Sequence, residues 1–331
     1  YWYFQKNTDS GSFFSGILLN DGQRLHSGIS NVFCDNQEGI WMSTNKGLYY
    51  YNPYRFSFSG FNSSFFQFKG TDDLKVFCFE ALSDKLLIGT LNGIYTEEID
   101  QENQSQIRLL VPGLRCHTLF KSKSGVIWIG AEDGLYSMRP DGSVSKTLDV
   151  YAYTIIEPVP GTLVIGTSNH GLLQLEEASK RVSTLFAHSL LPDIRQVVSW
   201  NRHWVGFCSN GLFFVDPIKR KVQYAYENGR HMAANLPPDV RVLVCLFADK
   251  EGLLWLGTYG GLYVWDPVKA HMYRLSTSEG LVNNSVKAIV QDADRSIWVT
   301  TSKGISRIEK KRSGAGYKFT IRNYNENDGV S

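Results

Sequence analysis

The sequence predicts an all-β protein built from repeated antiparallel sheets, and two observations support this. First, a short phrase recurs seven times in the 331 residues: an aromatic or aliphatic residue, an apolar one, a small one, then a tight turn ending in Gly and another apolar residue. The copies start at Trp41, Leu87, Trp128, Val164, Trp204, Trp255 and Trp298. Second, 43% of the residues are hydrophobic, 13% are aromatic and 30 are Gly, a composition typical of packed strands and turns.

The spacing of the copies predicts the architecture. Successive copies start 36 to 51 residues apart, the period of one propeller blade. We therefore expect an all-β, seven-bladed β-propeller of four-stranded antiparallel blades across residues 28–331, with residues 1–27 packing on or closing the last blade. The expected blades are approximately 28–69, 72–111, 114–148, 150–188, 193–228, 239–276 and 284–324.

The sixth copy shows why each blade should contain four strands. Residues 240–247 form a β-branched and apolar run, and a turn separates them from a second apolar run at 253–257. A third run, 262–265, ends at an Asp-Pro turn, and the more polar run 272–275 follows. Apolar character falls from the first strand to the fourth, so we expect the first at the centre and the fourth at the rim.

Several recurring residues are best explained by architecture. Asp35, Asp249 and Asp292 each lie six residues before a motif Trp, and we expect them to accept turn N–H groups, because Asp at a turn start usually does so. The motif Trp side chains should pack between adjacent blades. The five cysteines, which form no C-x-x-C pair, are expected to be packed free thiols, with a bridge between Cys78 and Cys116 left open.

Charge and hydropathy exclude some functions. The net charge is +2 and the basic residues are dispersed, so no nucleic acid contact by this segment is expected. No apolar stretch approaches the roughly 18 residues of a membrane span. The chain begins without Met or a signal peptide pattern, as expected of a mature or excised segment. We expect no cofactor, no metal and no catalytic residue.

The pattern Asp-x-x-Gly-x-[IL]-Trp-[ILV]-[GST]-Thr-x-x-Gly-[IL]-x-x-[FYW]-[DN]-Pro resembles the two-component regulator propeller repeat, found in periplasmic sensor regions of Bacteroidetes hybrid two-component systems. The resemblance extends from about residue 28 to 331 and is looser where Leu87 and Val164 replace Trp. It implies two propellers and an immunoglobulin-like domain, followed by a membrane helix, histidine kinase, receiver and DNA-binding domain. None of these output modules is visible in the sequence, and residues 324–331 look like a connector to another repeat.

The same resemblance implies a non-catalytic role for this segment. It would lie in the periplasm as part of an inner-membrane protein and detect glycan fragments. It would thereby control transcription through the kinase and DNA-binding modules of the parent chain. Its partners would be the other propeller and the immunoglobulin-like domain, and a homodimer is left open.

One face of the propeller should carry the binding residues. Because strands alternate in direction, the second-to-third-strand turns and the connectors between blades emerge on the same face. Varied polar groups there suit an oligosaccharide or other polar small ligand, although solvated turns of any propeller use the same residue types. The candidates are Lys46, Asn92, Arg115, His117, Glu132, Asp133, Asn169, His170, Arg195, Asn210, Arg241, Tyr259 and Lys303.

Two other functions compete with sensing. A propeller glycosidase or lyase would need paired carboxylates or a His base, and the face offers Glu132 and Asp133, which should diverge because they are adjacent, together with His117 and His170. A protein-interaction scaffold could use the aromatic residues 1–4, which could equally pack on the last blade.

Overall fold

The structure is a computed structural model in which 75–83, 85–99, 105–139, 142–224, 226–227, 230–231, 242–266, 269, 271–314, 316–325, 328 and five earlier strands are described. The chain divides into two units, residues 1–59 with 326–330 and residues 60–325 with 331. Among the described residues, no helix has the length and apolar character of a membrane-spanning segment.

The first unit contains the first copy of the repeated phrase. Strands β1 (Ile17–Leu18) and β2 (Arg24–Leu25) form a short hairpin. Strands β3 (Ile29–Cys34), β4 (Ile40–Thr44) and β5 (Gly47–Tyr51) form an antiparallel sheet in that order. The remainder of the blade predicted at 28–69 lies outside the described residues.

The second unit contains six four-stranded antiparallel sheets in its described part, each a meander in chain order. Their strands are β6 (Val76–Ala81), β7 (Lys85–Thr90), β8 (Gly93–Ile99) and β9 (Ser105–Pro112); β10 (Cys116–Lys121), β11 (Ile127–Ala131), β12 (Leu135–Met138) and β13 (Val144–Leu148); β14 (Ala152–Val159), β15 (Thr162–Thr167), β16 (Leu172–Glu176) and β17 (Val182–Phe186); β18 (Gln196–Trp200), β19 (His203–Cys208), β20 (Gly211–Asp216) and β21 (Lys221–Tyr224); β24 (Leu243–Ala248), β25 (Leu254–Thr258), β26 (Leu262–Asp266) and β27 (His271–Leu275); β28 (Val286–Gln291), β29 (Ile297–Thr301), β30 (Gly304–Ser313) and β31 (Gly316–Tyr324).

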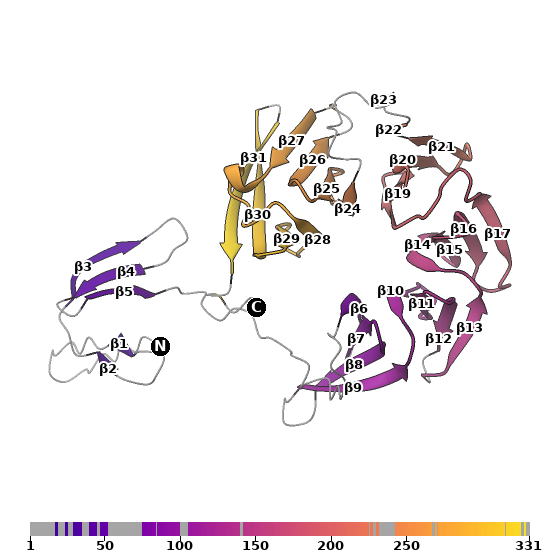
Figure 1. Ribbon diagram of the computed structural model, residues 1–331, viewed down its shortest axis with the longest axis horizontal. Helices are drawn as coiled ribbons and strands as arrows, with labels where there is room; N and C mark the ends of the chain where they lie inside the picture. Colours follow the sequence, from indigo (N-terminus) through magenta and orange to yellow (C-terminus); the bar gives the residue numbers. More distant parts are fainter. Residues whose placement is uncertain are drawn as a thin grey trace. The chain divides into compact units, whose positions relative to one another are not determined.

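Figure 1 shows these six sheets following one another in an arc, with the first strand of each on the inside and the fourth on the outside. The all-β class and the four-stranded blades are therefore confirmed, and the total of seven stays a prediction. Two short additions follow other strands: the hairpin of β22 (Tyr226–Glu227) and β23 (Arg230–His231), and a 3-10 turn at Thr277–Glu279.

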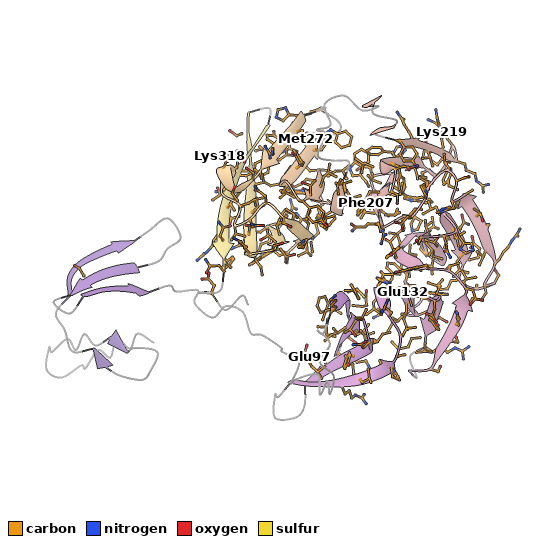
Figure 2. All side chains as sticks on the ribbon, in the orientation of Figure 1. Glu97, Glu132, Phe207, Lys219, Met272 and Lys318 are labelled. Carbon is orange, nitrogen blue, oxygen red and sulfur yellow. The ribbon has the colours of Figure 1, made fainter. Side chains whose placement is uncertain are left out.

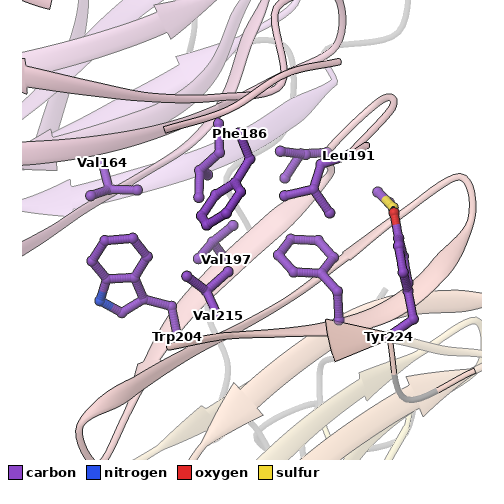
Figure 3. Packing of buried hydrophobic residues seen from close by; sticks show 11 residues of the cluster. Val164, Phe186, Leu191, Val197, Trp204, Val215 and Tyr224 are labelled. Carbon is purple, nitrogen blue, oxygen red and sulfur yellow. The ribbon is translucent and has the colours of Figure 1, made fainter. Parts of the chain in front are cut away.

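The core lies between neighbouring sheets. In the cluster drawn in Figure 3, Val164 of β15 and Phe186 of β17 pack with Trp204, Val215 and Tyr224 of the next sheet. Second strands are the most buried, and every residue of β11 and β25 is buried. First strands are less buried because one side of each faces the centre of the arc. Each sheet therefore contributes both a packed middle and an accessible inner edge (Figure 2).

Asp249 and Asp292 support their turns as predicted, and Asp35 lies outside the described residues. Asp249 Oδ1 accepts the backbone N–H groups of Glu251 at 2.9 Å and Leu253 at 3.0 Å. Its Oδ2 accepts the indole N–H of Trp255 at 2.8 Å, a bond that the sequence did not reveal. Asp292 is arranged in the same way around Trp298, 2.8 Å from the indole nitrogen. The carboxylate thus accepts hydrogen bonds from both the turn N–H groups and the indole N–H of a Trp packed in the core.

In the third copy, different residues provide the carboxylate that accepts the motif Trp indole N–H. Ser122 takes the place of the Asp, and Glu177 of the next sheet supplies the carboxylate. Its Oε1 accepts the Trp128 indole N–H at 2.9 Å and the Ser122 hydroxyl at 2.7 Å. The indole of Trp128 is fully buried, so its N–H needs this acceptor.

Small residues in the second strands allow neighbouring sheets to approach. A Cβ on Gly130 would lie 2.5 Å from the Thr118 methyl group and 2.8 Å from the backbone oxygen of Ala152 in the next sheet. The described cysteines Cys78, Cys116, Cys208 and Cys245 are free, as predicted.

Candidate functional site

An extra residue interrupts the first strand at the same position in five of the six sheets of the described second unit. The pairing register shifts between Val76 and Cys78 in β6, and the same shift recurs in β10, β14, β24 and β28. The inserted residues are Phe77, His117, Tyr153, Val244 and Lys287. A β-bulge leaves its residue out of the ladder and redirects the side chain. Each first strand therefore presents one side chain by the same backbone device.

The remaining sheet, β18–β21, has no such shift, but Gln196 occupies the corresponding place. It directly precedes Val197, which pairs with Gly206 of the second strand. Its side-chain oxygen accepts the backbone N–H of Leu246 at 2.8 Å, so it also ties β18 to β24.

These six residues line a single cavity of about 570 Å³, which we call the mouth: Phe77, His117, Tyr153, Gln196, Val244 and Lys287. Arg195, Val242 and Tyr259 contribute to the same lining. The volume falls within the range of small-molecule sites, about 300–1,000 Å³. The mouth lies where first strands begin, on the face that carries the second-to-third-strand turns.

Aromatic rings form one wall of the mouth. The His117 ring lies 5.1 Å from Phe77 and 5.0 Å from Tyr153, measured between centroids. Tyr151 stacks on Tyr153 at 4.6 Å. Phe77 is 43% exposed, which leaves an apolar ring surface open to a ligand. Aromatic faces of this kind can stack on the flat face of a sugar or another ring.

Glu132 sits beside this wall in a hydrogen-bonded network. One Arg115 nitrogen donates to both Glu132 oxygens at 2.9 Å, and the Tyr151 hydroxyl donates to Oε1 at 2.9 Å. Burial by itself would raise the pKa of Glu132, but these hydrogen bonds and the Arg115 charge outweigh it and lower the pKa. The carboxylate is therefore charged and already paired at neutral pH.

His117 contacts the same carboxylate less closely, with Nε2 3.7 Å from Glu132 Oε1. Burial, the largest influence, lowers the pKa of His117 and outweighs the attraction of Glu132. At neutral pH the ring is thus neutral, and it can accept as well as donate a hydrogen bond. Its Nε2 lies 3.2 Å from the Tyr151 hydroxyl.

Two cations also line the mouth. Arg195 pairs with Asp193, with a shortest separation of 2.6 Å, and its guanidinium lies 4.4 Å from the centre of the Tyr153 ring. Burial would raise the pKa of Asp193, but hydrogen bonds from Ser168 and Arg195 outweigh it and lower the pKa. The Lys287 ammonium lies 4.9 Å from the centre of the Tyr259 ring, at the edge of the cavity.

The structure gathers some of the predicted binding residues and separates others. Arg115, His117 and Glu132 form one network, and Arg195 and Tyr259 line the same mouth. Other predicted residues lie in turns away from its lining: Asn92, Asp133, Asn169, His170, Asn210 and Lys303. Lys46 and Arg241 lie outside the described residues.

The separated residues have local partners. Asp133 accepts the Tyr136 hydroxyl at 2.6 Å, whereas its neighbour Glu132 faces Arg115, so the two carboxylates diverge as predicted. His170 Nδ1 and the Asn169 side-chain oxygen are 2.8 Å apart. No three His, Cys, Asp or Glu side chains are grouped as metal ligands in the described parts of the chain.

The predicted binding residues leave out several that line the mouth or contact its lining, namely Phe77, Tyr151, Tyr153, Asp193 and Lys287. A usable signal existed: each bulge residue directly precedes the residue that pairs with the small second-strand residue, such as Gly89 or Gly130. Aligning the copies on that residue would have identified the position. Strand alternation alone could not, because a bulge breaks the two-residue period.

Comparisons agree with the repeat and the fold. The model of the two-component regulator propeller family matches residues 235–260 and 280–303, so these segments carry that repeat, as the sequence indicated. No curated protein is detectably similar to the chain.

Several solved structures share the fold. The extracellular domain of a protein described as a one component system from B. thetaiotaomicron is 19% identical with a TM-score of 0.63, covering 98% of this chain and 46% of that one. A similar domain, described as part of a hybrid two component system of the same organism, is 18% identical with a TM-score of 0.63, covering 99% and 49%. This chain thus spans about half the length of these relatives.

A streptogramin B lyase is 15% identical with a TM-score of 0.56, covering 76% of this chain and 82% of the lyase. Proteins of different activities therefore share this architecture, and the fold alone does not assign one.

Proposed function

We propose that this segment is a non-catalytic, ligand-sensing propeller of an extracytoplasmic regulator. The two-component regulator propeller repeat and the extracellular domains with the same fold support this assignment. The parent protein would be a sensor histidine kinase held in the inner membrane, with this segment in the periplasm. Other propeller and immunoglobulin-like domains of the parent chain would pass the signal to its kinase and DNA-binding modules.

The mouth is the observation that carries the proposal. Six equivalent backbone positions present Phe, His, Tyr, Gln, Val and Lys, so the framework is constant while its contents differ. An architectural position holds a narrow set of apolar residues, as the motif position does with Trp in five copies and Leu87 or Val164 in the other two. Different side chains on rigid strands are typical of a site fitted to one asymmetric ligand.

A glycan fragment, preferably an acidic one, fits this mouth. The rings of Phe77 and Tyr153 offer stacking surfaces, and neutral His117 can exchange hydrogen bonds with hydroxyl groups. Among the described residues that line the cavity there is no carboxylate; Lys287 contributes a positive charge, whereas the charge of Arg195 is paired with Asp193. The nearby Glu132 is neutralised by Arg115, so it opposes an acidic ligand less than its charge suggests.

Calorimetric titration with depolymerised neutral, uronate-containing and sulfated glycans tests the proposal. We expect an acidic fragment to bind without being converted, and Lys287→Ala to weaken binding about tenfold. Lys219→Ala is the matched control, because Lys219 lies in the β20–β21 turn at the opposite end of its sheet, and it should bind normally. If Lys287→Ala and Tyr153→Ala both bind the glycan as tightly as the control Lys219→Ala does, the mouth is not the binding site.

A propeller enzyme is the second candidate, and the lyase with the same fold is the observation that favours it. The same titration mixtures, analysed by mass spectrometry, report turnover. If the wild type forms products and Glu132→Gln or His170→Ala does not, the segment is an enzyme and not a non-catalytic sensor. If no glycan binds and the protein forms a stable dimer by light scattering, an interaction scaffold is the better assignment.

A further inference from the structure

Two cysteines of neighbouring sheets meet in the core. Cys78 lies on β6 and Cys116 on β10, two first strands that lie side by side. Their sulfur atoms are 3.6 Å apart, which is van der Waals contact and about 1.6 Å longer than a disulfide bond. Both side chains are free thiols in the structure.

The two sulfurs occupy space that is available because residue 89 is Gly and has no side chain. A Cβ on Gly89 would lie 2.4 Å from the Cys78 sulfur and 2.7 Å from the Cys116 sulfur. The two sulfurs therefore lie over the same glycine, on the side where an alanine methyl group would stand. No other side chain has to leave for the sulfurs to move toward each other.

Equivalent contacts in other sheets are made without a cysteine pair. Thr118 and Ala152 meet over Gly130, and Cys245 meets Val286 over Gly257. Packing alone thus accepts several small residues at these positions. Two cysteines facing each other are a special case of this contact, and the only such case in the described sheets.

We propose that Cys78 and Cys116 form a reversible disulfide that staples sheet β6–β9 to sheet β10–β13 when the protein meets a small-molecule disulfide. The half-buried Cys78 reacts first, because Cys116 is fully buried. This inference depends on the packing of the sheets and not on the proposed sensing function.

The chemistry balances as thiol–disulfide exchange. The Cys78 thiolate attacks one sulfur of R–S–S–R, which gives a mixed disulfide and releases one R–S⁻. The Cys116 thiolate then attacks the Cys78 sulfur, forms the internal bond and releases the second R–S⁻. The cysteines lose two protons and two electrons, and the oxidant is reduced to two thiols. In the reduced protein the hydrogen bond with Cys78 and burial both raise the pKa of Cys116. Burial persists in the mixed disulfide, so it limits the Cys116 thiolate available for the second step.

The staple would act next to the mouth. Phe77 directly precedes Cys78, and His117 directly follows Cys116, and their rings are 5.1 Å apart. Joining the two strands would fix these two rings of the aromatic wall relative to each other. It would also constrain the unfolded chain across a long loop, since the two cysteines are 38 positions apart.

Peptide mapping tests the proposal. The purified protein is incubated with oxidised glutathione or with dithiothreitol, alkylated and digested without reduction. We expect a Cys78–Cys116 linked peptide, lighter by two hydrogen atoms than the sum of the reduced peptides. The thermal midpoint of the oxidised protein should exceed that of the reduced protein by about 5–10 °C.

Variants make the outcome specific. Cys78→Ser should abolish both the linked peptide and the oxidation-dependent rise in midpoint, whereas Cys208→Ser should retain both, because Cys208 contacts Tyr224 and not a second thiol. The comparison is made between oxidised and reduced forms of each variant, so a general loss of stability cancels. A glutathione adduct that persists on Cys78, alkylation of all five cysteines, or a link from Cys78 or Cys116 to another cysteine would each overturn the proposal. If Cys78→Ser does not fold, the wild-type map decides alone.

Discussion

At the turn from the first strand to the second, the same Asp–Trp pair recurs in sheets β24–β27 and β28–β31, whereas at the opposite end, in the mouth, only the backbone repeats. Asp249 and Asp292 hold their turns and Trp indoles by the same bonds. The bulge residues Phe77 and Lys287 share a backbone position and nothing else. The difference separates two kinds of selection: one end is constrained by packing, and the other is free to be fitted to a ligand.

The third copy shows how strictly the constrained end is maintained. Where Ser122 replaces the Asp, Glu177 from the neighbouring sheet provides the missing acceptor for Trp128. Lys180 lies 4.3 Å from the Trp128 ring centre, and Lys310 lies 5.7 Å from that of Trp255, each from the following sheet. Different residues thus rebuild the same surroundings of a buried indole.

Removing the acceptor should cause the largest effect. Asp249→Ala deprives the buried Trp255 indole and two turn N–H groups of their partner, and it removes a carboxylate paired with the buried Lys310. We expect a loss of about 3–5 kcal/mol, measured by denaturant unfolding. Asp294→Ala, in an exposed turn, is the control and should unfold like the wild type. A loss below about 1 kcal/mol would mean that the repeated Asp is not a structural requirement.

Crowding the contact between sheets should be the next largest effect. Gly130→Ala places a methyl group against the Ala152 backbone oxygen, which cannot rotate away, and should cost about 1–3 kcal/mol. For Gly257→Ala the nearest atoms belong to the side chains of Cys245 and Val286, so its cost should be smaller. Thermal unfolding of the two variants side by side measures the difference. Equal losses would show that backbone contact is not the deciding factor.

In the third copy, the acceptor Glu177 can be replaced by an Asp at position 122, where other copies have their acceptor. Glu177→Ala should lower the free energy of unfolding by about 1–3 kcal/mol, because the Trp128 indole loses its acceptor. Adding Ser122→Asp restores the arrangement of the other copies and should recover part of the loss. A double variant no more stable than the single one would contradict the equivalence of the two arrangements.

The charge of Glu177 should affect how the stability of the protein depends on pH. Burial raises its pKa, but hydrogen bonds from Trp128, Ser122 and Ser124 outweigh it, so the pKa in the folded protein is lowered. A carboxyl whose pKa falls on folding contributes stability above its unfolded pKa of about 4.3, and this contribution is lost as the pH falls through the folded value. Glu177→Gln should therefore lose less stability than the wild type on acidification. Parallel midpoint curves from neutral pH to below pH 4 would contradict this.

The mouth should show the smallest effect on stability. Lys287 is exposed, and its described interaction is with the Tyr259 ring, so Lys287→Ala should change the free energy of unfolding by no more than about 0.5 kcal/mol. Its effect is expected on ligand binding instead. If its unfolding midpoint drops as far as that of Gly130→Ala, the mouth is part of the architecture and the comparison between the two ends fails.

The sequence predicted the constrained end well. The repeated phrase identified the second strands, the turns and the role of Asp249, because these features depend on residues within one blade. Five of the predicted binding residues lie in or beside the mouth, namely Arg115, His117, Glu132, Arg195 and Tyr259, and their role in binding stays a prediction. The sequence could not identify Tyr153 or Lys287, because a bulge changes the side of the sheet that a residue faces and leaves no hydrophobic pattern.

By itself, then, the sequence determined the blade framework, since hydrophobic alternation and turn chemistry act over a few residues. Tertiary structure alone decided which distant groups meet. Trp128 and Glu177 are 49 positions apart, and the sulfurs of Cys78 and Cys116 are 38 apart. Such contacts depend on how closely neighbouring sheets approach and in which register their strands pair, and no local pattern encodes either quantity.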